Sequence, residues 1–496
     1  MGIIKKQAFQ SSVYIYTGVA LAFITTGLLA PNYLTPGQIG TINLIASWSG
    51  IFAGIGILGF TTATVRFFPY FRNEKTGHNG FFLLSILVGT VGFLFFLALY
   101  YPIKPWIIEM NQEKSPLFAQ FFFLVIPLTF FQIYFSLLDV YNNMLYRSST
   151  GIILREFIQR VFILIGMLFF VFHLLNFEGY IYFYTAAICL PTILIIIFLI
   201  DKKAVHFRLN TKILTGKLLK SISSVSFFGF LNTFSNLAII RIDVIMINHF
   251  IDSAATGIYV TSFYFGTLVQ MPARALNRIA PVLIADAYKE NDFATIKDIY
   301  YKSSLNLFVI ALFLLLGLTV NIDNIYKIIP ENFAEGRLVI VYIGLANVIR
   351  LAGGSNDSII SFSKYYRYIT LFFVIFLILI FSFNLYFIPE KGITGAAIAS
   401  VLAILIFQII KILFIYIKFG FQPFNWKFIH AGAAAATVYM LIGMIQPIQP
   451  FIADIALRSL LATALYGGFI YYTEISTDIN QSIHLFIEKM NNIIKR

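Results

Sequence analysis

The chain has 496 residues, of which 59% are hydrophobic and only 11% are charged, and its mean hydropathy is +0.84. This composition excludes a water-soluble globular protein, because too few polar residues are present to cover a folded surface. The formal net charge of +13 does not indicate a nucleic-acid partner, because Lys and Arg gather in alternate connectors between apolar stretches.

About fourteen apolar stretches, each of roughly 20 residues, follow one another along the chain. We predict membrane spans at 10–30, 40–64, 80–101, 117–141, 152–175, 180–200, 222–248, 254–283, 303–321, 337–360, 366–388, 393–418, 428–447 and 453–473. The sequence therefore predicts an all-α, multi-pass integral membrane protein.

The Lys and Arg content of the connectors predicts the orientation. One alternating set holds most of the basic residues, including those between Lys202 and Lys220, whereas the other set holds few. Cytoplasmic loops carry the excess of Lys and Arg, so both termini are predicted to be cytoplasmic.

The connector 201–221 is the longest one on the predicted inner side. In it, apolar residues such as Phe207 and Leu214 interleave with Lys212 and Lys217. We predict a basic amphipathic helix that lies on the anionic inner leaflet.

Four short correspondences relate the two sides of this connector. With offsets of 217, 212, 213 and 213 residues, they pair Gly40 with Gly257, Pro69 with Pro281, Asn143 with Asn356 and Gly179 with Gly392. We predict two parallel six-helix lobes and two extra helices. The predicted segments are 1–200 (first lobe), 201–221 (amphipathic linker), 222–418 (second lobe), 419–473 (two further helices) and 474–496 (cytoplasmic tail).

This organisation resembles a known family. The two lobes, an Arg-x-x-Pro near the end of the second helix of each lobe, and Arg241-Ile242-Asp243 followed by Gly257-Ile258-Tyr259 resemble the polysaccharide transporter branch of the multidrug/oligosaccharidyl-lipid/polysaccharide exporter superfamily. The opening segment, with Tyr16-Thr17-Gly18 and Pro31-Asn32-Tyr33-Leu34, is similar to O-antigen and capsule flippases of that branch.

The resemblance implies a MATE-like transporter and not an enzyme. Its implied substrate is an undecaprenyl-diphosphate-linked oligosaccharide, moved by alternating access from the inner to the outer leaflet of the bacterial cytoplasmic (inner) membrane. The implied partners are this lipid-linked substrate, membrane lipids and the polysaccharide polymerase machinery.

Other functions stay open at this point. A peptidoglycan-precursor flippase or a multidrug exporter of the same superfamily would have the same fold, although an exporter of organic cations should concentrate carboxylates in its cavity. A membrane polysaccharide polymerase or ligase is disfavoured, because the outer connectors are too short for a sizeable catalytic loop.

Charged residues within the spans are the candidate site residues, because a charge at the centre of a membrane helix costs about 2.5 to 3.5 kcal/mol on insertion scales. In the eighth span a polar stripe recurs every four residues and comprises Ser262, Gly266, Gln270, Arg274 and Arg278. We predict that Arg274 and Arg278 bind the diphosphate, since Arg offers bidentate donors and stays charged. The alternative is that both side chains reach to the cytoplasmic interface.

Arg66 and Arg350 are two further candidates for the diphosphate. Arg66 corresponds to Arg278 in the repeat, and it is alternatively a topology anchor. Arg350 lies near the middle of the tenth span, on the same face as Asn347 and Asp357.

In the seventh span Asn232, Asn236 and Asp243 share one face. We predict that Asn232, Asn236, Asn347 and Gln270 are polar residues of the cavity. Asp243 or Asp357 is predicted to couple transport to H+ or Na+; an interhelical ion pair is the alternative for Asp243.

Glu156 and Arg160 are spaced as an ordinary i,i+4 helix pair. The six histidines show no metal-ligand spacing, and we predict neither a metal nor a cofactor.

The predicted topology can be checked by labelling. Tags inserted at 110 and 328 should react with a membrane-impermeant reagent from outside the cell, because those connectors are poor in Lys and Arg. Tags at 212 and 490 should be protected until the membrane is permeabilised. The reversed pattern at either pair would contradict the orientation.

Overall fold

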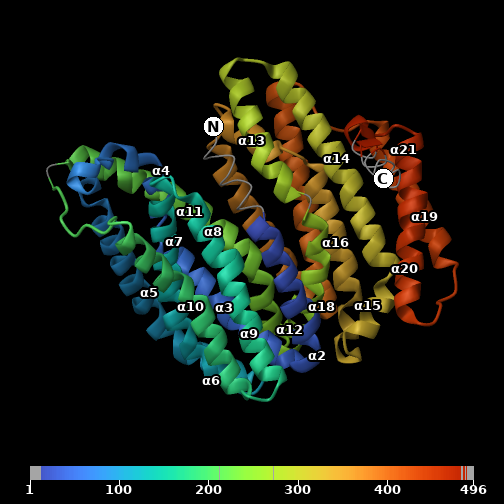
Figure 1. The fold of residues 1–496 in the computed structure, drawn as a ribbon, viewed down its shortest axis with the longest axis horizontal. Coiled ribbons are helices and arrows are strands. Elements are labelled where there is room, and N and C mark those ends of the chain that lie inside the picture. Colours follow the sequence, from blue (N-terminus) through green and yellow to red (C-terminus); the bar gives the residue numbers. More distant parts are fainter. Residues whose placement is uncertain (1–12, 212, 272, 482–483, 486–487, 489–496) are drawn as a thin grey trace. The chain divides into compact units, whose positions relative to one another are not determined.

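The computed structural model shows a helical protein (Figure 1). It describes residues 13–211, 213–271, 273–481, 484, 485 and 488, and it describes only the backbone of Ser148, Asn232, 235–240 and 274–279. Within these residues every helix or strand assignment is helical, which confirms the predicted all-α class.

Contacts within the chain divide it into a first unit, Met1–Val260, and a second unit, Thr261–Arg496. The boundary falls inside the helix Ser253–Thr267, labelled α12. The predicted segments, with lobes separated at 201–221, stay a prediction about the repeats.

The first unit contains the helices up to the middle of α12. Their bounds are η1 (Phe23–Leu29), α2 (Ala30–Tyr33), α3 (Pro36–Gly56), α4 (Phe60–Phe71), η2 (Glu74–Thr76), η3 (His78–Gly80), α5 (Phe81–Asn111), α6 (Pro116–Phe121), η4 (Phe122–Leu124), α7 (Val125–Met144), α8 (Ser148–Ile152), η5 (Ile153–Ile158), α9 (Gln159–Val171), α10 (Phe177–Asp201) and α11 (Gly216–Phe250).

The start of α3 and its end have clear local causes. Thr35 and Gln38 form a reciprocal capping box, and Pro36 occupies the first turn, where no backbone N–H is needed. Gly59, with a φ of +67°, separates α3 from α4. A residue with a side chain adopts that backbone conformation only at a cost, so the predicted span 40–64 becomes two helices.

An aromatic core holds α7 against α4 and α5. The rings of Phe68 and Phe81 meet edge to face with centroids 5.3 Å apart, and Phe68 meets Tyr141 in the same way at 5.7 Å. All three side chains are buried. Since Tyr141 lies on one side of α7, the opposite side of that helix is free to line a cavity.

The second unit contains the rest of α12 and the helices that follow it. Their bounds are η6 (Leu268–Gln270), α13 (Ala273–Lys289), α14 (Phe293–Val320), α15 (Ile322–Ile328), η7 (Glu331–Gly336), α16 (Arg337–Ala352), α17 (Asn356–Phe362), α18 (Tyr368–Phe419), α19 (Trp426–Gly443), α20 (Phe451–Ala462), η8 (Thr463–Gly467) and α21 (Gly468–Tyr472). Two predicted spans, 366–388 and 393–418, fall within α18, which changes direction at Gly392 because its φ is +62°.

Asp454 ties the last helices of the second unit to α15. Its Oδ2 accepts hydrogen bonds from Asn324 Nδ2 of α15 at 2.6 Å and from Arg458 Nε at 2.8 Å. Arg458 also donates to the carbonyl oxygen of Ile445 at 2.8 Å. This cluster gives a structural role to an arginine inside a predicted span.

Among the described residues, nine helical segments are long and apolar enough to cross a membrane, from the 21-residue Val13–Tyr33 to the 52-residue Tyr368–Phe419. Helical structure is present in each predicted span. The exact number of crossings stays a prediction.

The prediction of an amphipathic helix over 201–221 is wrong for most of that segment. Residues 204–210 are not helical, and α11 begins only at Gly216. The strap (residues 202–211 and 213–215) instead packs against other parts of the first unit, where the Asn210 backbone N–H donates to Asn79 O at 3.1 Å and Tyr141 Oη donates to Ala204 O at 2.9 Å. These two bonds give the Asn210 N–H and the Ala204 carbonyl the partners that a helix would otherwise supply.

The repeat-equivalent glycines Gly40 and Gly257 meet each other in the first unit. A Cβ atom on Gly40 would overlap the carbonyl oxygen of Ser253, and one on Gly257 would overlap that of Pro36. Ser253 and Pro36 are themselves separated by the offset of 217 residues that relates the two glycines. The contact is therefore reciprocal, as a two-fold relation between α3 and α12 requires.

Substituting Gly40 by Ala should destabilise the protein by about 1–3 kcal/mol, because the added methyl group forces the two backbones apart. Gly37→Ala is the matched control on the same helix, since its Cβ would lie 3.7 Å from Ser253 Oγ, an ordinary contact. Thermal unfolding of the purified variants should show a lower Tm for Gly40→Ala alone. Equal Tm values would show that the close approach is not required.

Candidate functional site

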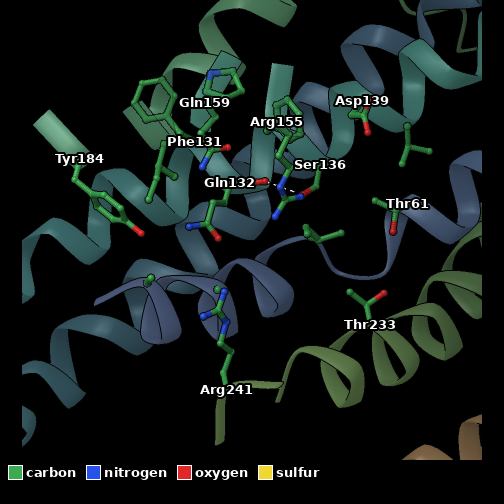
Figure 2. Close-up of a pocket in the computed structure, with 17 residues that line it drawn as sticks. Thr61, Phe131, Gln132, Ser136, Asp139, Arg155, Gln159, Tyr184, Thr233 and Arg241 are labelled. Atoms are coloured by element: carbon green, nitrogen blue, oxygen red, sulfur yellow. Dashed lines mark hydrogen bonds between the residues drawn. The ribbon is translucent and has the colours of Figure 1, made fainter. Parts of the chain in front are cut away.

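The first unit contains an open cavity of about 610 Å³ with a partly polar lining (Figure 2). The lining residues are Ala46, Gly50, Ile57, Thr61, Phe131, Gln132, Phe135, Ser136, Asp139, Val140, Arg155, Gln159, Tyr184, Ile188, Pro191, Thr233 and Arg241. They come from α3, α4, α7, η5, α9, α10 and α11, so segments far apart in the sequence form one site.

One face of α7 supplies the longest run of lining side chains. Gln132, Ser136 and Asp139 recur at intervals of four and three residues, which places them on the face opposite the aromatic core. Ser136 Oγ donates to Gln132 O at 2.8 Å, and Gln132 Nε2 donates to Ser49 Oγ of α3 at 3.1 Å. These bonds fix the polar wall of the cavity.

Arg155 and Arg241 are the cationic side chains of this lining, and they extend into the same space from opposite walls (Figure 2). Arg155 comes from η5, a π-helical turn, and Arg241 comes from α11. Gly50 of α3 lies beside Arg241, where a Cβ atom would be in ordinary contact with the Arg241 Nε at 3.9 Å. Within the described part of the chain neither guanidinium forms a salt bridge with a carboxylate.

Asp139 is the single carboxylate among the lining residues described. Its Oδ1 is buried without a hydrogen-bond partner among the described residues and lies against Gly151, where a Cβ atom would overlap it. Asn143, one turn along α7, bonds to the Asp139 side chain, and Arg155 interacts with it electrostatically. Two guanidiniums and one carboxylate leave the cavity with an excess of positive charge, which suits an anionic ligand.

The chain matches a known protein family. Residues 4–284, more than half of the chain, match the family described as polysaccharide biosynthesis protein. The chain belongs to this family. A comparison with curated proteins found no match.

Solved structures with the same fold are membrane transporters. This polysaccharide biosynthesis family member superposes on the lipid II flippase MurJ in an inward closed conformation with a TM-score of 0.73 and 13% identity, covering 94% of this chain and 99% of that one. An outward-facing multidrug resistance MATE transporter of the MOP superfamily gives 0.55 and 12%, with coverage of 83% and 94%. A variant of the Vibrio cholerae MATE transporter VcmN gives 0.54 and 14%, with coverage of 83% and 97%.

These identities show the fold alone, which is MurJ-like and MATE-like. Together with the family match they confirm the predicted resemblance to the exporter superfamily and the predicted fold class. The predicted site residues of this family member lie in several different places in the structure.

Several predicted residues lie outside the described side chains. Arg274 and Arg278 belong to α13, and Asn232 and Asn236 belong to α11, but only their backbone is described. Arg66 lies on α4 and is exposed, with its guanidinium carbon 5.8 Å from the centre of the Phe67 ring. It is not among the residues that line the cavity of the first unit.

The described part of the stripe in the eighth span packs against helices of the second unit. Asn347 of α16 accepts a hydrogen bond from the Gln270 amide and donates to Gly266 O at 3.1 Å. Ser262 Oγ contacts Tyr326 Oη at 3.4 Å. The expectation of one uninterrupted helical stripe is wrong, because α12 ends at Thr267 and a 3₁₀ turn precedes α13.

Asp243 is 5% exposed, and its Oδ2 accepts a hydrogen bond from Tyr259 Oη at 2.8 Å. That bond joins α11 to the first-unit part of α12, so Asp243 holds two helices together there. It is not among the lining residues of the described cavity. Its role in ion coupling stays a prediction.

Asp357 forms an ion pair in the second unit. Lys411 Nζ of α18 lies 3.0 Å from Asp357 Oδ1, and the Lys411 side chain is 3% exposed. Gln408, one turn earlier, donates to the backbone oxygen of Arg350 at 2.7 Å, while the Arg350 residue itself is exposed. The structure thus adds Lys411 as the partner of Asp357, and the predicted roles of Arg350 and Asp357 stay predictions.

The cavity residues Arg155, Arg241 and Asp139 were not among the predicted site residues. Arg241 carried a signal, as a charge well inside a predicted span. Arg155 and Asp139 lie near predicted span ends, where charges are ordinary, so hydropathy did not single them out. The predicted Glu156–Arg160 pair is confirmed at 2.6 Å, and Arg160 also donates to Gly18 O at 2.7 Å.

Asp357→Asn should reduce the free energy of unfolding by about 1.5–3 kcal/mol, because it leaves the buried Lys411 ammonium without its charged partner. Adding Lys411→Met should restore most of the loss, since no unpaired charge is left. Asp323→Asn is the control, because its pair with Arg337 is exposed and contributes little. The measurement is the Tm of each purified variant. If Asp357→Asn lowers the Tm no more than Asp323→Asn does, the pair of Asp357 with Lys411 does not stabilise the fold.

Proposed function

We propose that this chain moves a polyprenyl-diphosphate-linked oligosaccharide, with undecaprenyl as the lipid, from the inner to the outer leaflet of the bacterial cytoplasmic membrane. The family match and the transporter fold support the proposal. The substrate is a repeat unit of O-antigen, capsule or exopolysaccharide. Alternating access would pass it to polymerase machinery at the outer face, with both termini of the chain in the cytoplasm.

The observation that carries the proposal is the pair of guanidiniums in the cavity of the first unit. Arg155 and Arg241 enter the same space from different helices, and no described carboxylate forms a salt bridge with either. A guanidinium presents parallel N–H donors that match two phosphate oxygens, and it stays charged at physiological pH. Two of them in one cavity suit the two phosphorus centres of a diphosphate.

The remaining lining suits the sugar next to the diphosphate. Gln132 and Gln159 offer amide groups, and Tyr184 offers an aromatic face with a hydroxyl group. Phe131 and Phe135 add apolar surface beside them. A site with a few placed polar groups on an apolar background is typical of ligand cavities.

The charge of the cavity disfavours export of organic cations. Such a substrate needs carboxylates, whereas the described lining holds one carboxylate and two guanidiniums. A peptidoglycan precursor carries the same polyprenyl diphosphate, so the cavity suits its anionic part equally well. The two substrates differ in their sugars, and a flipping assay with each lipid decides between them.

Reconstituted protein should translocate a polyprenyl-diphosphate oligosaccharide, and Arg155→Ala and Arg241→Ala should each weaken its binding. Loss of one charged hydrogen bond is worth about 1.5–3 kcal/mol, which is roughly ten- to a hundredfold in affinity. Arg155→Lys and Arg241→Lys should lie between Ala and the wild type, because the charge is kept and the planar fork is lost. Arg208→Ala, an exposed residue of the strap, is the matched control and should bind as the wild type does.

Flipping is measured in two sets of proteoliposomes. One set contains a polysaccharide repeat unit on the polyprenyl diphosphate, and the other contains a peptidoglycan precursor on the same lipid. Flipping of the precursor alone would replace the proposed substrate, and export of a cationic dye without flipping of either lipid would refute the proposal. Wild-type binding by both alanine variants, at wild-type protein levels, would move the diphosphate away from this cavity. Arg66, Arg274, Arg278 and Arg350 would then be the arginines to test.

A further inference from the structure

We propose that Asp139 takes up a proton when a diphosphate enters the cavity of the first unit, so that anion binding and proton binding assist each other. This rests on the proposed function, because the anion is the diphosphate of the substrate. It names H+ as the ion linked to binding, and it places the linked group on α7 instead of at Asp243 or Asp357.

The argument begins with the position of Asp139. It lines the same cavity as Arg155 and Arg241, from a different helix than either (Figure 2). Arg155 is close enough to interact with it electrostatically, yet no described ion pair within 4 Å involves Asp139. The carboxylate therefore compensates the guanidinium charge without occupying its hydrogen-bond donors.

The second step concerns the immediate surroundings of the carboxyl group. In the part of the chain that the structure describes, Oδ1 is buried without a hydrogen-bond partner and rests against Gly151, while Asn143 bonds to the same side chain. A buried, ionised oxygen that lacks a donor is unfavourable unless a nearby positive charge compensates it. Arg155 is that charge as long as the cavity holds no anion.

The third step is the charge balance of the cavity. When Asp139 is ionised, Arg155, Arg241 and Asp139 together give the cavity a net charge of +1. When Asp139 is protonated, the net charge of the cavity is +2. A diphosphate esterified on both sides carries one ionised oxygen on each phosphorus. A protonated Asp139 therefore matches such a ligand, whereas an ionised one repels it and competes for Arg155.

The groups that face Asp139 leave few other candidates for the proton. Besides Arg155 and Arg241, the titratable side chain of the described lining is Tyr184 of α10, whose ordinary titration lies near pH 10. The lining residues from α3, α4 and the junction between them are the uncharged Ala46, Gly50, Ile57 and Thr61, and α8 presents Gly151. Among the described lining residues α5 contributes none.

The expected direction follows from linkage. As the pH falls, Asp139 gains its proton, the repulsion of the diphosphate disappears and affinity rises. For a single proton the rise is limited to about tenfold per pH unit. The ligand itself does not titrate in this range when both phosphates are esterified, so the pH dependence reports on the protein.

The experiment is calorimetric titration of the full-length protein in nanodiscs. The probe is a diphosphate diester with a ten-carbon isoprenoid on one side and a single N-acetylglucosamine on the other. Binding is measured between pH 5.5 and 8.5, and at one pH in two buffers with different heats of ionisation, which counts the protons taken up.

The wild type should take up as much as one proton per bound ligand and bind more tightly at low pH. Asp139→Asn should bind at high pH at least as tightly as the wild type, with no proton uptake and a flat pH profile. Gly151→Ala, which displaces the Asp139 carboxyl group, should alter the pH profile while Asp139 is still present. Glu178→Gln, an exposed carboxylate on α10, should leave proton uptake unchanged.

Failure of this proposal is distinguishable from failure of the proposed function. Binding that is independent of pH in the wild type, or proton uptake that persists in Asp139→Asn, would overturn the linkage and leave the diphosphate site intact. Absence of wild-type binding, with no effect of Arg155→Ala or Arg241→Ala, would overturn both.

Discussion

A bilayer supplies neither hydrogen-bond partners for the backbone nor solvation for charges, and the rest of this structure depends on that constraint. The backbone is satisfied within helices throughout the described regular elements. Charges inside the helical units are satisfied by one another: Lys411 binds Asp357, and Arg458 binds Asp454. These pairs help to position α17, α18 and α20 in the second unit, and each of the four charges has a partner of opposite sign.

Arg155 and Arg241 stand apart from that pattern. They lie on a cavity where the described lining offers a single carboxylate, Asp139, and neither forms an ion pair with it. Two guanidiniums and one carboxylate leave an excess of positive charge in this cavity, which produces a positive local potential. An anionic ligand would match this excess of charge, and the proposed function supplies one in the diphosphate of a lipid-linked oligosaccharide.

Close approaches between backbones position the helices around this cavity. A Cβ on Gly56 would meet Gly92 O, and Gly59 lies directly against the backbone of Phe230 in α11. The first contact holds α3 against α5, and the second holds the junction of α3 and α4 against α11. The glycines of this stretch thus serve packing in the same way as small residues at other membrane helix interfaces, and through packing they shape the site.

The sequence by itself determined the class of protein, the approximate spans, the family and local pairs such as Glu156 with Arg160, because hydropathy and i,i+4 spacing are properties of neighbouring residues. Only the tertiary structure decided that Gln270 bonds to Asn347, that the strap packs without forming a helix, and that Arg155 faces a cavity. Membrane helices are apolar on nearly every side, so their sequences carry little periodic signal for which face meets a partner or a cavity. That choice is made by contacts between helices distant in the chain, which no local pattern contains.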